Sequence, residues 1–107
     1  RSPDLASLIC ISAKEFSRRF RHSPIWRATR DGLVRNVVVA LGNSGSDEAV
    51  PALAEALQDA SPVVRGHAAW ALGRIATEHT SRILKSAHRS EKDSFVLEEI
   101  AAAFGIS

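Results

Sequence analysis

Apolar, small and polar positions along this 107-residue chain follow the spacing of helices, and the same pattern occurs three times. Each copy carries an aliphatic residue, then an alanine, a large apolar residue and a glycine. The aligned positions are Leu33, Val64 and Val96; Ala40, Ala71 and Ala103; Leu41, Leu72 and Phe104; Gly42, Gly73 and Gly105. Successive glycines lie 31 and 32 residues apart, the length of one helix pair in a solenoid. The pattern predicts stacked helix pairs, each burying its apolar stripe against its neighbours.

Local signals place the helices of these repeats. We expect helices over residues 31–44, 47–58, 62–76, 80–88 and 93–104, with caps at Ser61 and Asp93, and Pro51 tolerated near the start of the second. Gly45 is the expected left-handed residue after the first helix. The stretch Val37–Val39 alone favours a strand. It aligns with helical stretches in the other copies, so we interpret it as helix.

Gly42 and Gly73 fall inside the predicted helices. A missing side chain there lets a neighbouring helix approach closely, at a cost of about 1 kcal/mol relative to alanine. The alternative is that each glycine ends its helix. In either case the chain belongs to the all-α class, as a short α-α superhelix.

The first 30 residues form a different segment. A short apolar helix is predicted over residues 3–11, and Ser12 with Glu15 has the form of a capping box for a second. Phe16 and Phe20 lie one turn apart on that second helix, which we expect to end at Pro24. Residues 25–30 are a predicted short connector before the first repeat, with a single helical turn as the alternative. The sequence thus predicts a basic helical segment, residues 1–30, packed on repeats in residues 31–107 as one compact domain.

Charge divides the chain more sharply than the net charge of +2 indicates. Residues 1–35 contain eight basic and three acidic residues, whereas residues 36–107 contain six basic and nine acidic ones. Such asymmetry indicates an anionic partner for one end, although the basic residues could instead be a solvated helix face. Arginine outnumbers lysine by seven to one in this first third, which suits bidentate contacts with phosphate.

Other kinds of chemistry find little support in the residues. The histidines are not grouped as metal ligands are, so no metal site is expected, and no nucleophile is accompanied by a recognisable base, so no catalytic residue is expected. The single cysteine, Cys10, cannot form an internal disulfide and fits a reducing compartment. Residues 42–46 superficially suggest a phosphate-binding loop, but the preceding strand and the lysine are missing. No apolar run has the length of a membrane span.

The repeats resemble the HEAT-like repeats that also occur in phycobilisome lyases. The resemblance is carried by residues 49–53, Leu57, Asp59, Val64, Arg65, residues 68–69 and residues 71–75. In that family the arginine equivalent to Arg65 bonds to the preceding turn, which makes Asp59 its expected partner here. Arg35 has Asp31 nearby as an equivalent structural partner. Trp70 is expected to be packed between units.

Residues 5–75 more specifically resemble the C-terminal part of bacterial epoxyqueuosine reductase. The carrying positions are Leu8, Ser12, residues 15–16, 18–21, 23–24, Arg27, residues 32–33, 35–36 and 40–45. The resemblance implies a parent oxidoreductase that forms queuosine at the wobble position of tRNA with cobalamin and two four-iron, four-sulfur clusters in an upstream portion. It implies that this chain holds no cofactor, is not itself an enzyme and helps to bind the anticodon stem-loop. We expect a cytoplasmic monomer without membrane contact, partnered by tRNA and the upstream catalytic domains.

The residues predicted to contact RNA phosphates are arginines of the first third and of the first repeat: Arg18, Arg19, Arg21, Arg27, Arg30 and Arg35. A competing hypothesis is a protein-interaction scaffold whose concave face binds a polypeptide. Residues 36–64 contain four acidic and no basic residues, which would suit a basic partner.

Overall fold

The computed structural model describes the backbone of residues 24–104 and the side chains of residues 28–104. These residues form α2 (Pro24–Ser44), the 3-10 turn η1 (Asp47–Ala49), α3 (Val50–Ala56), α4 (Pro62–Ile75), α5 (Glu78–Ser90) and α6 (Ser94–Ala103). The all-α prediction is confirmed for this part of the chain. The predicted helix over residues 3–11, the capping box at Ser12 and the helix carrying Phe16 and Phe20 lie outside the described residues.

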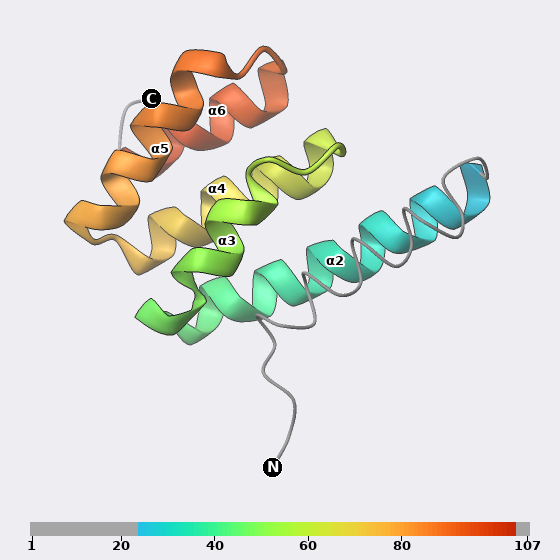
Figure 1. Ribbon diagram of the computed structural model, residues 1–107, viewed down its shortest axis with the longest axis horizontal. Helices are drawn as coiled ribbons and strands as arrows, with labels where there is room; N and C mark the ends of the chain where they lie inside the picture. The colour runs from blue at the N-terminus through green and yellow to red at the C-terminus, as the bar shows by residue number, and fades with distance from the viewer. Residues whose placement is uncertain (1–23, 105–107) are drawn as a thin grey trace.

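The helices form two layers. Helix α4 packs against α2 on one side and α6 on the other, and these three helices make one layer. Figure 1 shows them following one another from the bottom to the top of the view, with α3 and α5 lying over them as the second layer. The chain runs from α3 in the second layer to α4 in the first, and then from α5 to α6 in the same way. The helix pairs that the repeat pattern predicts are therefore α3 with α4 and α5 with α6.

Buried side chains from both layers make one continuous core. The fully buried members include Val38 of α2, Leu53 of α3, Leu72 of α4 and Ile100 of α6. The three-copy alignment places Val64 and Val96 correctly in this core, but it is wrong for Leu33, which is 49% exposed while Val34 is 1% exposed. The alignment does hold nearer the end of α2, where Leu41 is buried as Leu72 is in α4.

Glycines set the distance between neighbouring helices of the α2–α4–α6 layer. A Cβ atom added at Gly42 would lie 2.8 Å from the Ala71 Cβ, and one at Gly73 would lie 2.7 Å from the Ala103 Cβ. Both glycines are inside their helices. The prediction of close approach is confirmed. Gly45 has φ of +65° after the end of α2, as predicted.

The caps at Ser61 and Asp93 are confirmed, since both side chains accept N–H groups of the following turn. The predicted connector over residues 25–30 is wrong, because Pro24 begins a helix that continues through to Ser44. Proline is as compatible with the first helical turn as with a helix end. The predicted start at Thr80 is also wrong, since Thr77 caps α5 through a reciprocal capping box with Thr80. The second predicted helix is observed as η1 followed by α3.

Candidate nucleic-acid interface

The predicted phosphate-binding arginines fall into three groups in the structure. Arg18, Arg19 and Arg21 lie outside the described residues. Arg27 lies on the first turn of α2, and its side chain is outside the described ones. Arg30 and Arg35 lie on α2 with described side chains, and their surroundings differ completely.

Arg30 is held by carboxylates. It is 7% exposed, and its Nη1 donates to Asp59 Oδ2 at 2.7 Å and to Asp31 Oδ1 at 2.8 Å. The Nη2 atom forms a second hydrogen bond with Asp59, so the ion pair is bidentate. The hydrogen bonds that Arg30 donates to Asp59 raise the pKa of Arg30 above its ordinary value against the opposing effect of burial, with Asp31 adding to the rise. Its guanidinium is thereby already neutralised before any phosphate approaches.

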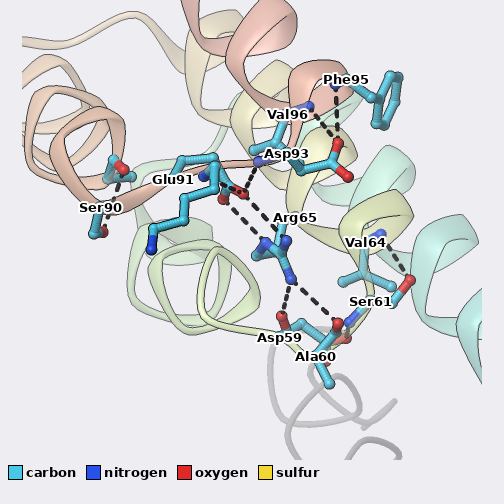
Figure 2. A network of polar contacts seen from close by, with 12 residues as sticks. Asp59, Ala60, Ser61, Val64, Arg65, Ser90, Glu91, Asp93, Phe95 and Val96 are labelled. Carbon is cyan, nitrogen blue, oxygen red and sulfur yellow. Dashed lines mark hydrogen bonds and ion pairs between the residues drawn. The ribbon is translucent and has the colours of Figure 1, made fainter.

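Arg65 makes the corresponding interaction one repeat later, from a position about one turn further along its helix. Its Nε and Nη2 donate to the two carboxylate oxygens of Glu91 at 3.0 and 3.1 Å. Its Nη1 donates to the backbone carbonyl oxygens of Asp59 at 2.8 Å and Ala60 at 3.2 Å. Figure 2 shows the Arg65 side chain between the turn before α4 and the turn before α6. The predicted contact of Arg65 with Asp59 is confirmed, through the carbonyl group and not the carboxylate.

Asp59 and Glu91 are equivalent residues, each two positions before the N-cap residue of a helix. Asp59 accepts the backbone N–H of Ser61 at 2.9 Å, and Glu91 accepts that of Asp93 at 3.0 Å. Each carboxylate therefore joins an arginine of the preceding α2–α4–α6 layer helix to the start of the next helix in that layer. We call these two arrangements the inter-repeat ion pairs.

Arg35 is exposed on α2 and is available to a ligand. Its Nη2 donates to Asn36 Oδ1 at 3.2 Å, an interaction between neighbours at the surface. The expected structural pairing of Arg35 with Asp31 is wrong, because the Asp31 carboxylate is bound by Arg30. The structure describes the side chains of two predicted arginines, Arg30 and Arg35. Of these two, Arg35 is the one that is exposed enough to bind a phosphate.

The exposed face of the α2–α4–α6 layer also carries aromatic side chains. Val39, His67, Trp70, Phe95 and Glu99 line a groove of about 320 Å³. The Arg74 guanidinium lies 5.6 Å from the centre of the Trp70 ring, and Trp70 packs against Gly42 as expected for a residue between units. Phe95 lies over Gly66, where an added Cβ would be 2.2 Å from the ring.

Sequence reasoning missed the basic side chains of the third repeat. Arg82, Lys85 and Arg89 are exposed on α5, and Lys92 follows that helix. The sequence contains the three basic residues of α5 at the spacing i, i+3 and i+7, which is visible without a structure. Residues 36–107 are acidic overall, however, and a charge count over that whole range conceals the basic residues of one helix.

In residues 28–104 no three His, Cys, Asp or Glu side chains come together in a way that could hold a metal ion. This part of the chain therefore does not fit an iron-sulfur cluster, and Cys10 lies outside it.

None of the helices described has both the length and the apolar character that a membrane crossing needs.

Stacked helix pairs of this kind are typical of helical repeat proteins. Residues 27–105 match the family of HEAT repeats, and the chain belongs to that family. Within it, the likeness is to epoxyqueuosine reductases. The Bacillus subtilis enzyme is 38% identical over 92% of this chain. An uncharacterized protein in the gldA 3′ region of Geobacillus stearothermophilus is 36% identical over 92% of it.

A similar solved structure is an epoxyqueuosine reductase in complex with an epoxyqueuosine-modified tRNA-Tyr stem-loop. It is 36% identical, covers 96% of this chain and superposes with a TM-score of 0.76. This chain spans 28% of that protein, 26% of the Bacillus subtilis enzyme and 46% of the Geobacillus protein. The likeness thus concerns one part of longer proteins.

Proposed function

We propose that this chain is a tRNA-binding HEAT-like module of an epoxyqueuosine reductase-like protein and that it contacts the anticodon stem-loop. The observation that carries the proposal is the likeness, at 36% identity over 96% of the chain, to an epoxyqueuosine reductase solved with a tRNA stem-loop. A rigid stack of helix pairs is suited to such a role because it fixes side chains of different helices relative to one another.

The proposed phosphate contacts come from Arg18, Arg19, Arg21, Arg27 and Arg35. Arg35 is supported by its exposure on α2, and the others by the basic composition of the first third. Arg30 has a structural role in this proposal and does not contact phosphate. Because it is bound to Asp59 and Asp31, it acts by holding α2 against the turn before α4, which fixes the direction in which Arg35 projects.

The redox chemistry belongs, in this proposal, to another portion of the parent protein. Cobalamin and two four-iron, four-sulfur clusters would be held there, and this chain would bind substrate without turnover of its own. We propose in addition that the protein is a cytoplasmic monomer, and that its partners are tRNA and the catalytic domains of the same polypeptide.

Fluorescence anisotropy with a labelled anticodon stem-loop RNA tests the proposal. We expect binding that weakens as salt rises, and a dependence of log K on log salt that becomes shallower by about 0.9 per lost duplex phosphate contact in Arg19→Ala and Arg35→Ala. Arg74→Ala is the matched control, because it removes the same charge from an exposed arginine that already lies over Trp70. Absence of salt-sensitive binding by the unsubstituted chain would reject the function.

The second candidate function is a protein-interaction scaffold. The groove lined by His67, Trp70 and Phe95 favours it, because aromatic side chains are enriched at protein interfaces. A pull-down at two salt concentrations separates the two functions. Salt-sensitive retention of tRNA supports the first, and retention of a polypeptide without tRNA supports the second.

A further inference from the structure

Helix α5 has a buried side and, opposite to it, a basic side. Thr80 and Leu84 are buried in the core, whereas Arg82, Lys85 and Arg89 are all exposed. These three residues have the spacing i, i+3 and i+7, which places them on one face of a helix. We call them the α5 basic row.

The α5 basic row is distinguished by the lack of carboxylate partners. Arg82 approaches Glu78 at 3.8 Å with side chains that are 71% and 86% exposed, a separation at which a surface pair contributes little. Lys85 and Arg89 form no ion pair with any residue in the described part of the chain. By contrast, Arg30 and Arg65 are bound to carboxylates. Arg35 on α2 and Arg74 on α4 are also exposed without an ion pair, so α5 and Lys92 hold four of the six described cations that have no close carboxylate partner.

A purely structural reason accounts for one member of the row. Arg89 lies in the last turn of α5, where a cation interacts favourably with the helix dipole. Arg82 and Lys85 lie further from that end, so the dipole does not explain them. A face that serves only solubility usually mixes both signs of charge, and the one acid on this side of α5 is Glu78, in the first turn.

The ligand that fits is a phosphodiester backbone. The row extends from Arg82 to Arg89, a rise of about 10 Å along the helix, and a nucleic-acid duplex presents several phosphates along that length. A lipid bilayer fits less well, because a helix that lies in a membrane surface must insert its apolar side. In α5 that side is occupied, since Ile83, Leu84 and Ala87 pack against the core.

We propose that Arg82, Lys85 and Arg89 bind the phosphate backbone of RNA and form a contact surface additional to the arginines of the first third. This inference rests on the proposed function and assigns part of the RNA interface to the third repeat. The exposed acids Asp47 and Glu48 of η1 would repel a phosphate. The RNA strand is therefore expected to follow α5 toward Lys92 and not to cross to η1.

The test compares two variants of the whole chain with equal changes in net charge. The first is Arg82→Gln, Lys85→Gln, Arg89→Gln, which keeps side chains of good helix propensity. The matched control is Asn43→Asp, Ser94→Glu, Ala102→Glu, at exposed positions outside α5. Anisotropy with the anticodon stem-loop RNA is measured from low to high salt, and circular dichroism checks that each variant melts as the unsubstituted chain does.

We expect the first variant to have a salt dependence shallower by up to about 2.7, at about 0.9 per duplex phosphate contact, and the control to keep the original slope. An equal effect of both variants would overturn the inference, since it would report net charge alone. If the unsubstituted chain binds RNA and the first variant binds with unchanged slope, the inference fails while the proposed function stands. If the unsubstituted chain binds no RNA, both fail.

Chemical protection gives a second measurement on the unsubstituted chain. Lys85 and Lys92 are exposed, and their acetylation by a small reagent can be followed by mass spectrometry. We expect the stem-loop RNA to slow acetylation of Lys85, and phosphatidylserine vesicles to leave it unchanged. Protection of Lys85 by the vesicles and not by RNA would replace the inference with a membrane contact.

Discussion

Arg30 and Arg65 each form an ion pair that joins two neighbouring repeats. A buried ion pair is favourable only when its geometry is good and its remaining polar atoms are bonded. Both inter-repeat ion pairs are bidentate, and both carboxylates also accept the backbone N–H of a helix-capping residue. Among the described residues, the Arg30 Nε is the one buried side-chain nitrogen or oxygen atom without a hydrogen-bond partner. The two arginines thereby fix where the next helix of the layer begins.

Removal of Arg30 is expected to destabilise the fold strongly. In Arg30→Met the Asp59 carboxylate, which is 9% exposed, keeps its burial but loses its counter-charge. Breaking a buried pair in this way costs about 3 to 5 kcal/mol. Urea unfolding followed by circular dichroism measures the change, with Arg35→Ala as a surface control expected within about 0.5 kcal/mol of the unsubstituted chain. Equal stability of the two variants would contradict the structural role of Arg30.

Glu91 gives the second ion pair a dependence on pH. Burial would raise the pKa of Glu91, but the hydrogen bonds from Arg65 and from the backbone N–H groups of Asp93 and Lys92 lower it overall, together with the attraction of Arg65. A carboxyl group whose pKa is lower in the folded state adds stability above its unfolded pKa and loses it as pH falls through the folded value. Glu91→Gln is therefore expected to be less stable than the unsubstituted chain at pH 7.

The stability difference between Glu91→Gln and the unsubstituted chain should shrink as pH falls below the ordinary pKa of glutamate and through the lowered pKa of Glu91. Urea unfolding at pH 7 and at pH 3 measures it. Glu98→Gln, at an exposed position of α6, is the control and should show little difference at either pH. A Glu91→Gln deficit that stays constant between the two pH values would show that the ionised carboxylate is not what stabilises the turn.

At the scale of elements, helix spacing depends on glycine. Gly42 brings α2 against α4, and Gly73 brings α4 against α6. In both cases the nearest atoms of the opposing alanine include its Cα, at 2.9 and 3.1 Å from an added Cβ, so a side chain cannot be accommodated by rotation alone. These glycines lower intrinsic helix stability and recover it through closer packing.

Two substitutions in α2 separate these effects. Gly42→Ala is expected to destabilise the protein by about 1 to 3 kcal/mol, because the added methyl group overpacks the contact with Ala71. Gly32→Ala adds the same methyl group where nothing lies within 4 Å, and it should stabilise the helix by up to about 1 kcal/mol. Thermal melting of both variants measures the opposite shifts. Stabilisation by both substitutions would show that helix propensity and not packing governs both positions.

The elements predictable from sequence were those whose signals are local. Ser61, Asp93 and Gly45 mark helix ends through their own side chains or backbone freedom, and each was placed correctly. Pro24 was misinterpreted because proline can follow one helix or begin the next. Thr77 was missed because Thr80, three residues later, is also a capping residue type. Only the reciprocal hydrogen bonds distinguish their roles.

At the scale of the whole molecule, the repeat period predicts the stacked helix pairs, but it does not predict which charged groups meet. Glu91 is 26 residues from Arg65, and Asp59 is 29 residues from Arg30. Which carboxylate an arginine binds depends on how far each helix is shifted along its neighbour. No local sequence pattern encodes that shift. For the same reason the sequence grouped Arg30 with Arg35, although the structure buries the first and exposes the second.

The central position of α4 predicts an order of unfolding. Helix α4 packs against α2, α3, α5 and α6, whereas α6 packs mainly against α4. In a solenoid each unit is stabilised by its neighbours, so end units open first. Native-state hydrogen exchange is therefore expected to show slower exchange over residues 62–75 than over residues 94–103.

Two cavity-forming substitutions distinguish opening of an end from global unfolding. Leu72 and Ile100 are both fully buried, and replacing either with alanine typically costs about 2 to 5 kcal/mol. Leu72→Ala should accelerate exchange in every helix, because α4 takes part in all the layer contacts. Ile100→Ala should accelerate exchange in α6, and less in α5, while α4 keeps most of its protection. Uniform acceleration by Ile100→Ala would show instead that the helix pairs unfold as one cooperative unit.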